Sequence, residues 1–464
     1  MKSRYPNIKY VLSHKNCLII ISLIFITTSI SHGELPIPGV NISPFGAQSV
    51  WPNNPDLAII LDRMQEAGIE WGRSDMMWWG LCETTPGVYN FTSPDYPGYE
   101  NWNVDQTVSM MKSRNIEPFP ILCYGNSLYD GGHGPSTETG RTAYGNYCYE
   151  AAYRYKDSIT YWEIWNEPNQ ELFWGATPNA ADYAEMAKVA ATRIRQANPD
   201  SVIAGGATSG IDLSYLQTAF QNGLLDAVDI ITIHPYRINK PESINSEIAT
   251  LRSMIETYTT RNIEIWTGEW GYNTYWSELT VMGQAKCLSR MMINNLSQNI
   301  PVSIWFSTHA FVELSGTDHD PEWGLLDYDY AKRESFYAMQ VLNQKLPAPV
   351  KYINDPLNVT LSPSISNQRI VVLERGDNNH HYTIAIWNAN WPISDSFAGN
   401  TTKVSFNANS SSEISAYNGL NGNPVQLIIS YNGEKTELNN FKVMDYPIFI
   451  DVDIPDYVTS FILY

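Results

Sequence analysis

The sequence is poor in cysteine and lacks the motifs that bind common cofactors. Its 464 residues include five cysteines, and no two of them have the CxxC spacing of a zinc site. No GxGxxG follows the first expected strand, so a dinucleotide site has no support. We therefore expect neither a metal nor an organic cofactor. One or two disulfides are permitted, with no indication of pairing, among the cysteines at Cys82, Cys123, Cys148 and Cys287.

Basic residues are also scarce. Lys and Arg together number 29 against 48 Asp and Glu, which gives a formal net charge of −19. A negative field of this size argues against nucleic acid and anionic membranes as partners, because both are themselves negatively charged. The balance suits a protein that acts on neutral ligands.

Long hydrophobic runs are absent except near the N-terminus. Basic residues there precede the apolar run "CLIIISLIFITTSI" (17–30), and the small residues of "SISHG" follow it. This order is typical of a secretory signal peptide, and the run is short for a membrane span. We expect a signal over residues 1–33 and a secreted or periplasmic mature chain with no membrane span. An uncleaved anchor is the alternative.

The remaining composition is that of a globular protein. Hydrophobic residues make up 43% of the chain and charged residues 17%, which provides for a sizeable core. The aromatic fraction of 12% is high. The length allows one large domain with a smaller one beside it.

From residue 34 to residue 346, short apolar runs alternate with amphipathic stretches. Eight such units predict a (β/α)8 barrel, and an open doubly wound sheet is the weaker alternative because it would not ordinarily need eight. The expected strands lie at 39–46, 69–75, 117–123, 158–165, 201–207, 227–234, 263–269 and 302–307. The expected helices lie at 56–67, 104–115, 141–155, 180–197, 213–222, 243–260, 279–298 and 331–346.

The pattern changes from residue 347 to residue 464. Helical periodicity is lost, and Asn, Gly, Asp and Pro separate short β-rich runs. This predicts an antiparallel all-β sandwich, which we expect to brace the barrel. The runs are "RIVVLER" (369–375), "HYTIAIWN" (381–388), "KVSFNA" (403–408), "VQLIISY" (425–431) and "YPIFIDV" (446–452).

Two acids stand where barrel enzymes carry their chemistry. Active residues of such barrels lie at the C-terminal ends of the strands. The fourth expected strand ends at Glu167, within "NEP", and the seventh ends at Glu269. Paired carboxylates across a cleft are what glycoside hydrolysis requires: one protonates the leaving oxygen, and the other attacks the anomeric carbon or activates water. Glu163 and Glu264 lie inside strands, and we assign them to structure.

Several segments carry a resemblance to known enzymes. "WEIWNEPN" and "IWTGEWG" resemble the acid/base and nucleophile motifs of clan A glycoside hydrolases, which are retaining (β/α)8 enzymes. Within the clan, the chain looks closest to family 39 and to family 5-like sequences. The second-strand segment "WGRSDMMWWGLCETTPGVYNF", the third-strand segment "PFPILCYGNSLY", "IHPYR" and "WGLLDYDYAKRESFYAM" are also similar to that group.

The resemblance implies roles for the two acids and their neighbours. Glu167 would be the general acid/base and Glu269 the nucleophile, with carboxyl groups about 5 Å apart and a covalent intermediate. Asn166 would bind the 2-hydroxyl of the sugar. Arg73 would lie beneath Glu269 as its ionic neighbour, although a barrel-closing ion pair is the alternative.

Three further side chains complete the expected site. The resemblance implies that His234 and Tyr236 orient Glu269, and that Trp305 forms an apolar floor beneath the sugar. A structural role is the alternative for His234. The function expected is that of a secreted retaining β-glycosidase of β-xylosidase or β-glucanase type, acting on an oligosaccharide or polysaccharide. A transglycosylase and a non-catalytic carbohydrate-binding protein are the alternatives.

Overall fold

The computed structural model describes residues 43–48, 54–78, 81–92, 96, 98–274, 277–310, 323–376 and 380–455. The chain divides into two compact units, 1–35 and 36–464, and every described residue belongs to the second. The expected signal segment therefore lies outside the described residues. Among the residues within these ranges, no helix combines the length and the apolarity needed to span a bilayer.

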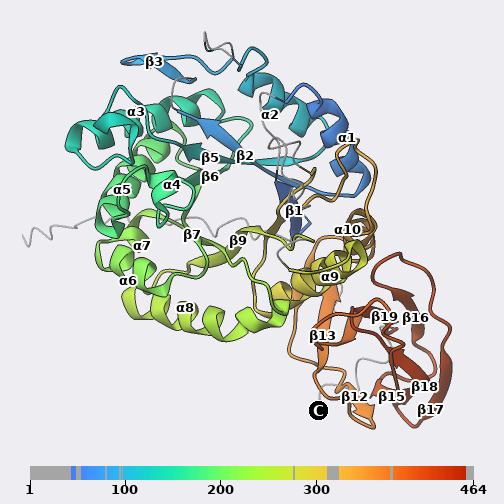
Figure 1. Cartoon of the computed structure of the whole chain (residues 1–464). Coiled ribbons are helices and arrows are strands. Elements are labelled where there is room, and N and C mark those ends of the chain that lie inside the picture. The colour runs from blue at the N-terminus through green and yellow to red at the C-terminus, as the bar shows by residue number, and fades with distance from the viewer. Residues whose placement is uncertain are drawn as a thin grey trace, which may run out of the picture. The chain divides into compact units, whose positions relative to one another are not determined.

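Eight parallel strands close into a barrel, which confirms the expected fold (Figure 1). Around the barrel the strands follow the order β1, β2, β5, β6, β7, β8, β9, β10, so each strand pairs with its successor along the chain and β10 closes on β1. Their bounds are β1 (Phe45–Gln48), β2 (Trp71–Met77), β5 (Glu117–Cys123), β6 (Tyr161–Ile164), β7 (Val202–Ser209), β8 (Ile230–His234), β9 (Glu264–Trp270) and β10 (Ser303–Trp305).

Helices surround the barrel, and each of the eight expected helices is present within a few residues of its predicted bounds. Side-chain caps account for several of their starts: Asn103 accepts from the backbone of α2, and Asn179 accepts from that of α5. The α-helices are α1 (Leu57–Glu66), α2 (Val104–Lys112), α3 (Glu138–Arg154), α4 (Glu171–Trp174), α5 (Ala180–Ala197), α6 (Leu213–Gln221), α7 (Leu224–Ala227), α8 (Asn245–Tyr258), α9 (Val281–Ser297) and α10 (Glu334–Lys345).

Aromatic rings fill the lower part of the barrel interior. Trp71 packs edge-on against Tyr161 and Trp266, with ring centroids 4.9 and 5.3 Å apart, and Phe119 completes the group. Room for Trp71 depends on Gly46 in the neighbouring strand, because a Cβ there would lie only 2.6 Å from that of Trp71. This layer closes the barrel below the polar groups at its mouth.

The C-terminal residues form two antiparallel sheets, which confirms the expected all-β sandwich. One sheet has the order β11-β13-β14-β19-β16 and the other β12-β15-β18-β17. The strands are β11 (Val350–Tyr352), β12 (Thr360–Ser362), β13 (Gln368–Arg375), β14 (His381–Asn388), β15 (Asn400–Asn407), β16 (Glu413–Asn418), β17 (Ile428–Asn432), β18 (Lys435–Val443) and β19 (Ile448–Asp453).

Helix α9 joins the sandwich to the barrel. Every residue from Gly283 to Leu296 is buried, so this helix has no face in solvent. Its Arg290 forms a buried ion pair with Glu242 at 2.6 Å, and Trp387 of β14 donates its indole N–H to the same carboxylate at 2.7 Å. Lys286 pairs with Asp445 at 2.9 Å. The sandwich therefore supplies Asp445 as the partner of Lys286, and Trp387 as a donor to the carboxylate that pairs with Arg290.

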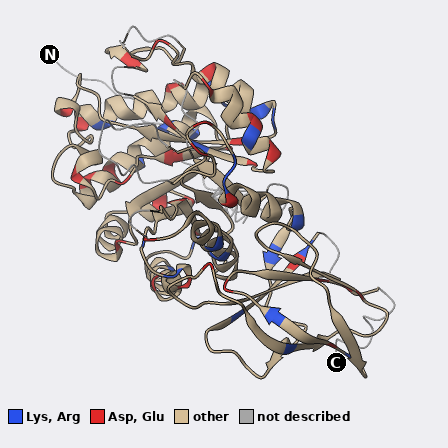
Figure 2. Ribbon diagram, turned by 45° about the vertical axis from the view of Figure 1, so that its right-hand side comes forward, with Lys and Arg blue, Asp and Glu red and all other residues tan. Residues whose placement is uncertain are grey.

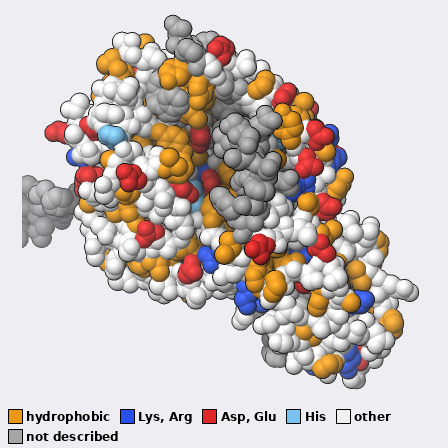
Figure 3. All heavy atoms as spheres, viewed as in Figure 1, with side chains coloured by type: hydrophobic (Ala, Val, Ile, Leu, Met, Phe, Trp, Pro, Cys, Tyr) orange, Lys and Arg blue, Asp and Glu red, His pale blue; other side chains and the backbone are white. Residues whose placement is uncertain are grey.

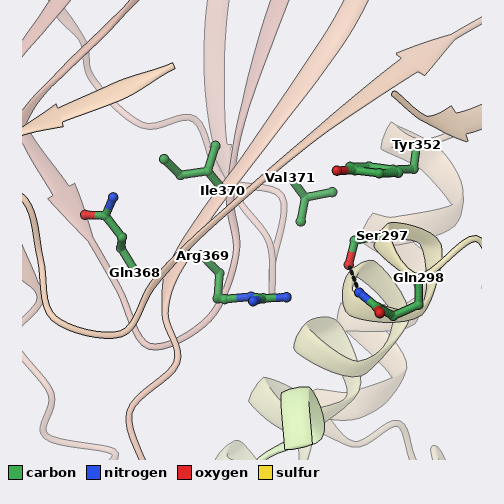
Figure 4. A pocket seen from close by; sticks show the side chains of 7 residues that line it. All are labelled: Ser297, Gln298, Tyr352, Gln368, Arg369, Ile370 and Val371. Atoms are coloured by element: carbon green, nitrogen blue, oxygen red, sulfur yellow. Dashed lines mark hydrogen bonds between the residues drawn. The ribbon is translucent and has the colours of Figure 1, made fainter. Parts of the chain in front are cut away.

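A pocket of about 360 Å³ lies along the same junction. Figure 4 shows that Arg369 of β13 and Tyr352 of β11 face the last turn of α9, at Ser297 and Gln298. Since α9 runs antiparallel to the barrel strands, its C-terminal end lies at the opposite end of the barrel from Glu167 and Glu269. This pocket is therefore separate from the expected active face.

Some elements were not anticipated. The loop after β2 contains a short hairpin of β3 (Glu83–Thr85) and β4 (Val88–Tyr89), and the described part of the chain also forms the 3-10 turns η1 (Asp130–Gly132) and η2 (Pro241–Ile244). Strands β11, β12, β16 and β18 were also missed. Strand β18 is central in its sheet, but polar residues predominate in "KTELNNFKV" and hide its alternation.

The four described cysteines are free and buried. Burial raises the pKa of each thiol, Cys123 among them. These four cysteines therefore form no disulfide with one another. Acidic side chains recur around the barrel helices, with fewer basic ones between them (Figure 2), in keeping with the negative net charge.

Candidate active site

Arg73 lies at the base of the barrel mouth and holds the site together. It is fully buried, and its Nε lies 2.7 Å from Oε2 of Glu163. Its Nη1 donates to Glu269 at 2.7 Å and to Gln48 at 2.6 Å, and its Nη2 donates to Oδ1 of Asn166 at 3.0 Å. Burial works against the charge, but Glu163 and Glu269 outweigh it and raise the pKa of Arg73. The planar guanidinium thus orients three strand ends at once.

Glu269 points into the mouth because β9 contains a bulge. Two steps along β10, from Ser303 to Trp305, match three along β9, from Thr267 to Trp270. Thr267 accepts from Asn295 of α9 and so faces outward; strict alternation would turn Glu269 outward as well. The extra residue in β9 turns the Glu269 side chain inward instead.

The preceding Gly268 matters for the same local geometry. A Cβ at this position would lie 3.0 Å from Oε1 of the buried Glu163. Glycine therefore leaves space for the Glu163 carboxylate beneath Glu269, where that carboxylate pairs with Arg73.

Both carboxylate oxygens of Glu269 accept hydrogen bonds. Oε2 accepts from Arg73, and Oε1 accepts from the Tyr236 hydroxyl at 2.7 Å. Burial and the charge of Glu269 raise the pKa of Tyr236, so its hydroxyl remains a donor. Two donors on an acceptor-only group are the environment of an ionised carboxylate.

Glu167 reaches the mouth by way of an unusual backbone path. Trp165 and Glu167 have φ values of 67° and 43°, in the left-handed region that non-glycine residues rarely adopt. The Glu167 amide donates to the Ala207 carbonyl at 2.9 Å, so the loop after β6 crosses the end of β7. The crossing brings the Glu167 side chain next to β8, and such local strain is typical of functional sites.

His234 therefore contacts Glu167, whereas the resemblance implied that it would orient Glu269. Its Nδ1 lies 2.9 Å from Oε1 of Glu167, and its Nε2 lies 3.3 Å from Nη2 of Arg73. An arginine nitrogen can only donate, so Nε2 must accept, and the proton of the neutral ring is on Nδ1. Burial lowers the pKa of His234 to about 4, which keeps it neutral. His234 thus donates to Glu167.

The two glutamates lie close together in contrasting environments. A carboxylate oxygen of Glu167, one of Glu269 and a ring nitrogen of His234 all lie within 4.8 Å of one another. Burial raises the pKa of Glu167 to about 7, against an ordinary value of 4.5. With Oε1 accepting from His234, the acid proton of Glu167 is on Oε2. These three residues could hold a metal ion, but Arg73 already brings a positive charge to Glu269.

Asn166 also takes up a defined orientation. Its Oδ1 accepts from Arg73, which directs the amide nitrogen away from the guanidinium. The side chain is buried and lies two residues after the end of β6. An amide donor is thereby presented beside the two carboxylates.

Trp305 does not form an apolar floor. It has no exposed surface, and its indole N–H donates to the Trp323 carbonyl at 3.2 Å. The next residue, Phe306, is half-buried and packs edge-on against Tyr236, with ring centroids 6.3 Å apart. Trp323 packs against both of these rings. Phe306 and Trp323, and not Trp305, are therefore the partly exposed aromatic rings beside Tyr236.

Other aromatic residues near the barrel mouth divide into two groups. Trp78, Trp174 and Trp270 are buried packing residues, whereas Tyr124 is half-buried and its ring stacks on that of Phe173. Trp79 and Trp276 lie outside the described residues. Figure 3 shows acidic side chains in the hollowed centre of the face, with hydrophobic side chains around them.

Sequence reasoning missed two residues of the mouth and part of the role of a third. Gln48 ends β1, and Asp75 lies in β2 two residues after Arg73. Glu163 is structural, as expected, but it also neutralises Arg73 beneath the two glutamates. The signal that could have found Gln48 and Asp75 is their position near the C-terminal end of a barrel strand.

Comparison with known proteins agrees with this geometry. The sequence matches the Cellulase family (glycosyl hydrolase family 5) over residues 34–310, which is more than half of the chain. No curated protein sequence matches significantly.

Solved structures resemble the chain over nearly its whole length. A family 39 glycoside hydrolase from Bacteroides cellulosilyticus WH2 is 18% identical, with a TM-score of 0.69, and the match covers 90% of this chain and 82% of that one. A monomeric β-xylosidase from Caulobacter crescentus CB15 is 13% identical, with a TM-score of 0.61 and coverage of 90% and 97%. A family 30 endoxylanase from Clostridium papyrosolvens C71 is 14% identical, with a TM-score of 0.58 and coverage of 91% and 98%. These likenesses confirm the expected clan A fold, and the family match shows that the chain belongs to the Cellulase family, glycosyl hydrolase family 5, and is a glycoside hydrolase.

Proposed function

We propose that the chain is a retaining β-glycosidase that cleaves O-glycosidic bonds of an oligosaccharide or polysaccharide by double displacement. The observation that carries this proposal is the placement of Glu167 and Glu269, whose oxygens approach within 4.8 Å. Retaining enzymes hold their two carboxyl groups about 5 Å apart, whereas inverting enzymes need roughly 6.5–9.5 Å to admit a water.

In the first step Glu269 attacks the anomeric carbon. Arg73 and Tyr236 hold the nucleophile's oxygens, and protonated Glu167 gives its Oε2 proton to the leaving oxygen. The bond from the anomeric carbon to the leaving oxygen breaks as the bond to Glu269 forms. His234 donates to Oε1 of Glu167 throughout, so the carboxylate produced keeps a hydrogen-bond donor.

In the second step the roles reverse. Ionised Glu167 takes a proton from a water molecule, which attacks the anomeric carbon and releases Glu269. Because esterified Glu269 carries no charge, the repulsion between the two carboxylates is gone while Glu167 acts as the base. Asn166 would donate to the 2-hydroxyl of the sugar, and Phe306 with Trp323 would lie beneath the ring.

The substrate is proposed to be a neutral β-linked sugar of the xyloside or glucoside type. The solved structures of similar fold include a β-xylosidase, a glucosidase and an endoxylanase. The signal-like segment 1–33 supports secretion, which suits action on glycans outside the cell.

Two variants test the roles separately. Glu269→Gly should abolish hydrolysis of aryl glycosides, with circular dichroism and thermal unfolding preserved. Glu167→Ala should slow substrates with poor leaving groups far more than activated aryl glycosides, since only the former need protonation. Near-normal turnover in the first variant, or an equal loss on both substrate classes in the second, would contradict these roles.

The stereochemical course tests the mechanism itself. Proton NMR of a freshly started reaction on an aryl β-xyloside should show the β-anomer of the product before mutarotation. First appearance of the α-anomer would rule out double displacement. With excess acceptor sugar, new glycosides in place of free sugar would identify a transglycosylase.

A further inference from the structure

Asp75 is a carboxylate in the barrel mouth that the mechanism above does not use. Along β2, Trp71 and Arg73 point into the barrel and Met76 packs in the outer core, so alternation turns Asp75 inward. It pairs in register with Ile121 of β5, which in turn pairs with Glu163 of β6. Asp75 therefore lies one inward position nearer the rim than Arg73.

The charge of Asp75 acts on the residues around the site. With Glu163 and Glu269 it contributes to the raised pKa of Arg73, against the effect of burial. After burial, it is the largest cause of the raised pKa of Tyr124. Asp75 is half-buried and so keeps part of its surface accessible, and its effect on Arg73 places it within electrostatic reach of that guanidinium.

Negative charge exceeds positive charge at the mouth. Glu163, Glu269 and Asp75 are arranged around Arg73. In the loop after β8, Arg237 donates hydrogen bonds to the Pro235 carbonyl, the Ser243 hydroxyl and the Glu247 carboxylate. A sugar in this site therefore meets several hydrogen-bond acceptors, while Arg73 and Arg237 are both already paired with carboxylates.

We propose that Asp75 binds hydroxyl groups of a neutral sugar ring at the reacting subsite and makes this subsite reject uronic acids and sulfated sugars. The inference rests on the proposed function, and it names the class of sugar that the enzyme accepts. A carboxylate only accepts hydrogen bonds, and it can take two neighbouring hydroxyls at once. A second carboxylate on the sugar would meet like charge in a site of low dielectric constant, which is costly.

The test compares Asp75→Asn with a matched control. Asp157→Asn removes the same charge from an exposed loop that precedes β6, at the opposite end of the barrel. Each protein is assayed on 4-nitrophenyl β-D-glucoside, β-D-xyloside and β-D-glucuronide, which share one leaving group. The wild type should cleave the better neutral glycoside at least 100-fold faster than the glucuronide, as judged by kcat/KM.

Asp75→Asn should lower kcat/KM on the neutral glycosides about 10- to 100-fold, the range for a charged hydrogen-bond partner. The preference over the glucuronide should fall at least 10-fold. Asp157→Asn should match the wild type. Equal wild-type rates on glucoside and glucuronide, or an unchanged preference in Asp75→Asn, would overturn the inference.

Failure of the proposed function would look different. If the wild type cleaves none of these glycosides, the proposed activity on them is wrong. The role of Asp75 in sugar recognition can then still be tested by measuring binding. Calorimetric titration with free xylose, glucose and glucuronate should then show a preference for a neutral sugar that Asp75→Asn reduces. Tighter binding of glucuronate to the wild type would overturn the inference directly.

Discussion

Replacing Glu167 with glutamine should make the protein more stable while removing its activity. Glutamine keeps an oxygen that can accept from His234 and puts an N–H₂ where protonated Glu167 has its O–H, so it mimics the acid form. What it cannot do is ionise. The gain in stability should therefore appear only where the wild-type carboxyl is forced to lose its proton.

The size of the effect follows from the raised pKa. The pKa of Glu167 has its ordinary value of 4.5 in the unfolded chain and is about 7 in the folded state, so the folded state binds the proton more tightly. This group's contribution to stability is therefore complete below pH 4.5 and falls as the pH rises through that window. At about 1.4 kcal/mol per pKa unit, the cost to the wild type is about 1 kcal/mol at pH 5 and about 3 kcal/mol at pH 8.

The assay is urea denaturation of wild type and Glu167→Gln at pH 5 and at pH 8, followed by fluorescence and circular dichroism to test two-state behaviour. Comparing variant with wild type isolates this group. This comparison is needed because the lowered pKa of His234 has the opposite effect: it makes stability rise with pH between about pH 4 and pH 6.5. Glu256→Gln, at an exposed site on α8, is the matched control.

The expected result is an advantage for Glu167→Gln that grows by about 2 kcal/mol from pH 5 to pH 8, with no such trend in Glu256→Gln. An advantage independent of pH would mean that ionisation is not its source. A variant less stable than wild type at pH 8 would refute the buried-acid argument and, with it, the assignment of the acid proton to Oε2.

Four other outcomes are expected. In the wild type, kcat/KM on a substrate with a poor leaving group should fall above about pH 7 as Glu167 loses its proton; a flat profile to pH 9 would contradict this. Arg73→Met should leave Glu163 and Glu269 uncompensated and cost about 3–5 kcal/mol in urea denaturation, with activity lost. Dithiothreitol should leave the Tm unchanged, because the described cysteines are free. Truncation after Lys345 should give an insoluble or unfolded barrel, because it exposes α9; a folded, active truncation would show that bracing is dispensable.

Much of the architecture could be predicted because burial imposes a period on the sequence. The eight barrel strands are apolar runs covered on both sides, and the helices between them have one buried stripe, so both patterns are legible. The edge strand β17 buries no side chain, so its bounds were misplaced, and polar residues hide the alternation of β18, so that strand was missed.

The active face was predictable only as a set of strand ends. The pattern brought Glu167, Glu269, Arg73 and Asn166 to one rim, because parallel strands in a barrel all end on the same side. Which groups touch there depends on departures from regular geometry. No periodicity encodes the bulge that turns Glu269 inward or the left-handed φ of Glu167 that brings it to His234.

The amino-acid pattern alone determined that this chain is a closed eight-stranded barrel with a β-sandwich after it, since repeated burial of short apolar runs has few other solutions. It also determined that two glutamates share one end. Tertiary structure decided their chemistry: burial raises the pKa of one, Arg73 and Tyr236 bind the other, and Trp305 is fully buried while Phe306 stays partly exposed. These outcomes depend on contacts between residues far apart in the chain, at distances that local sequence cannot specify.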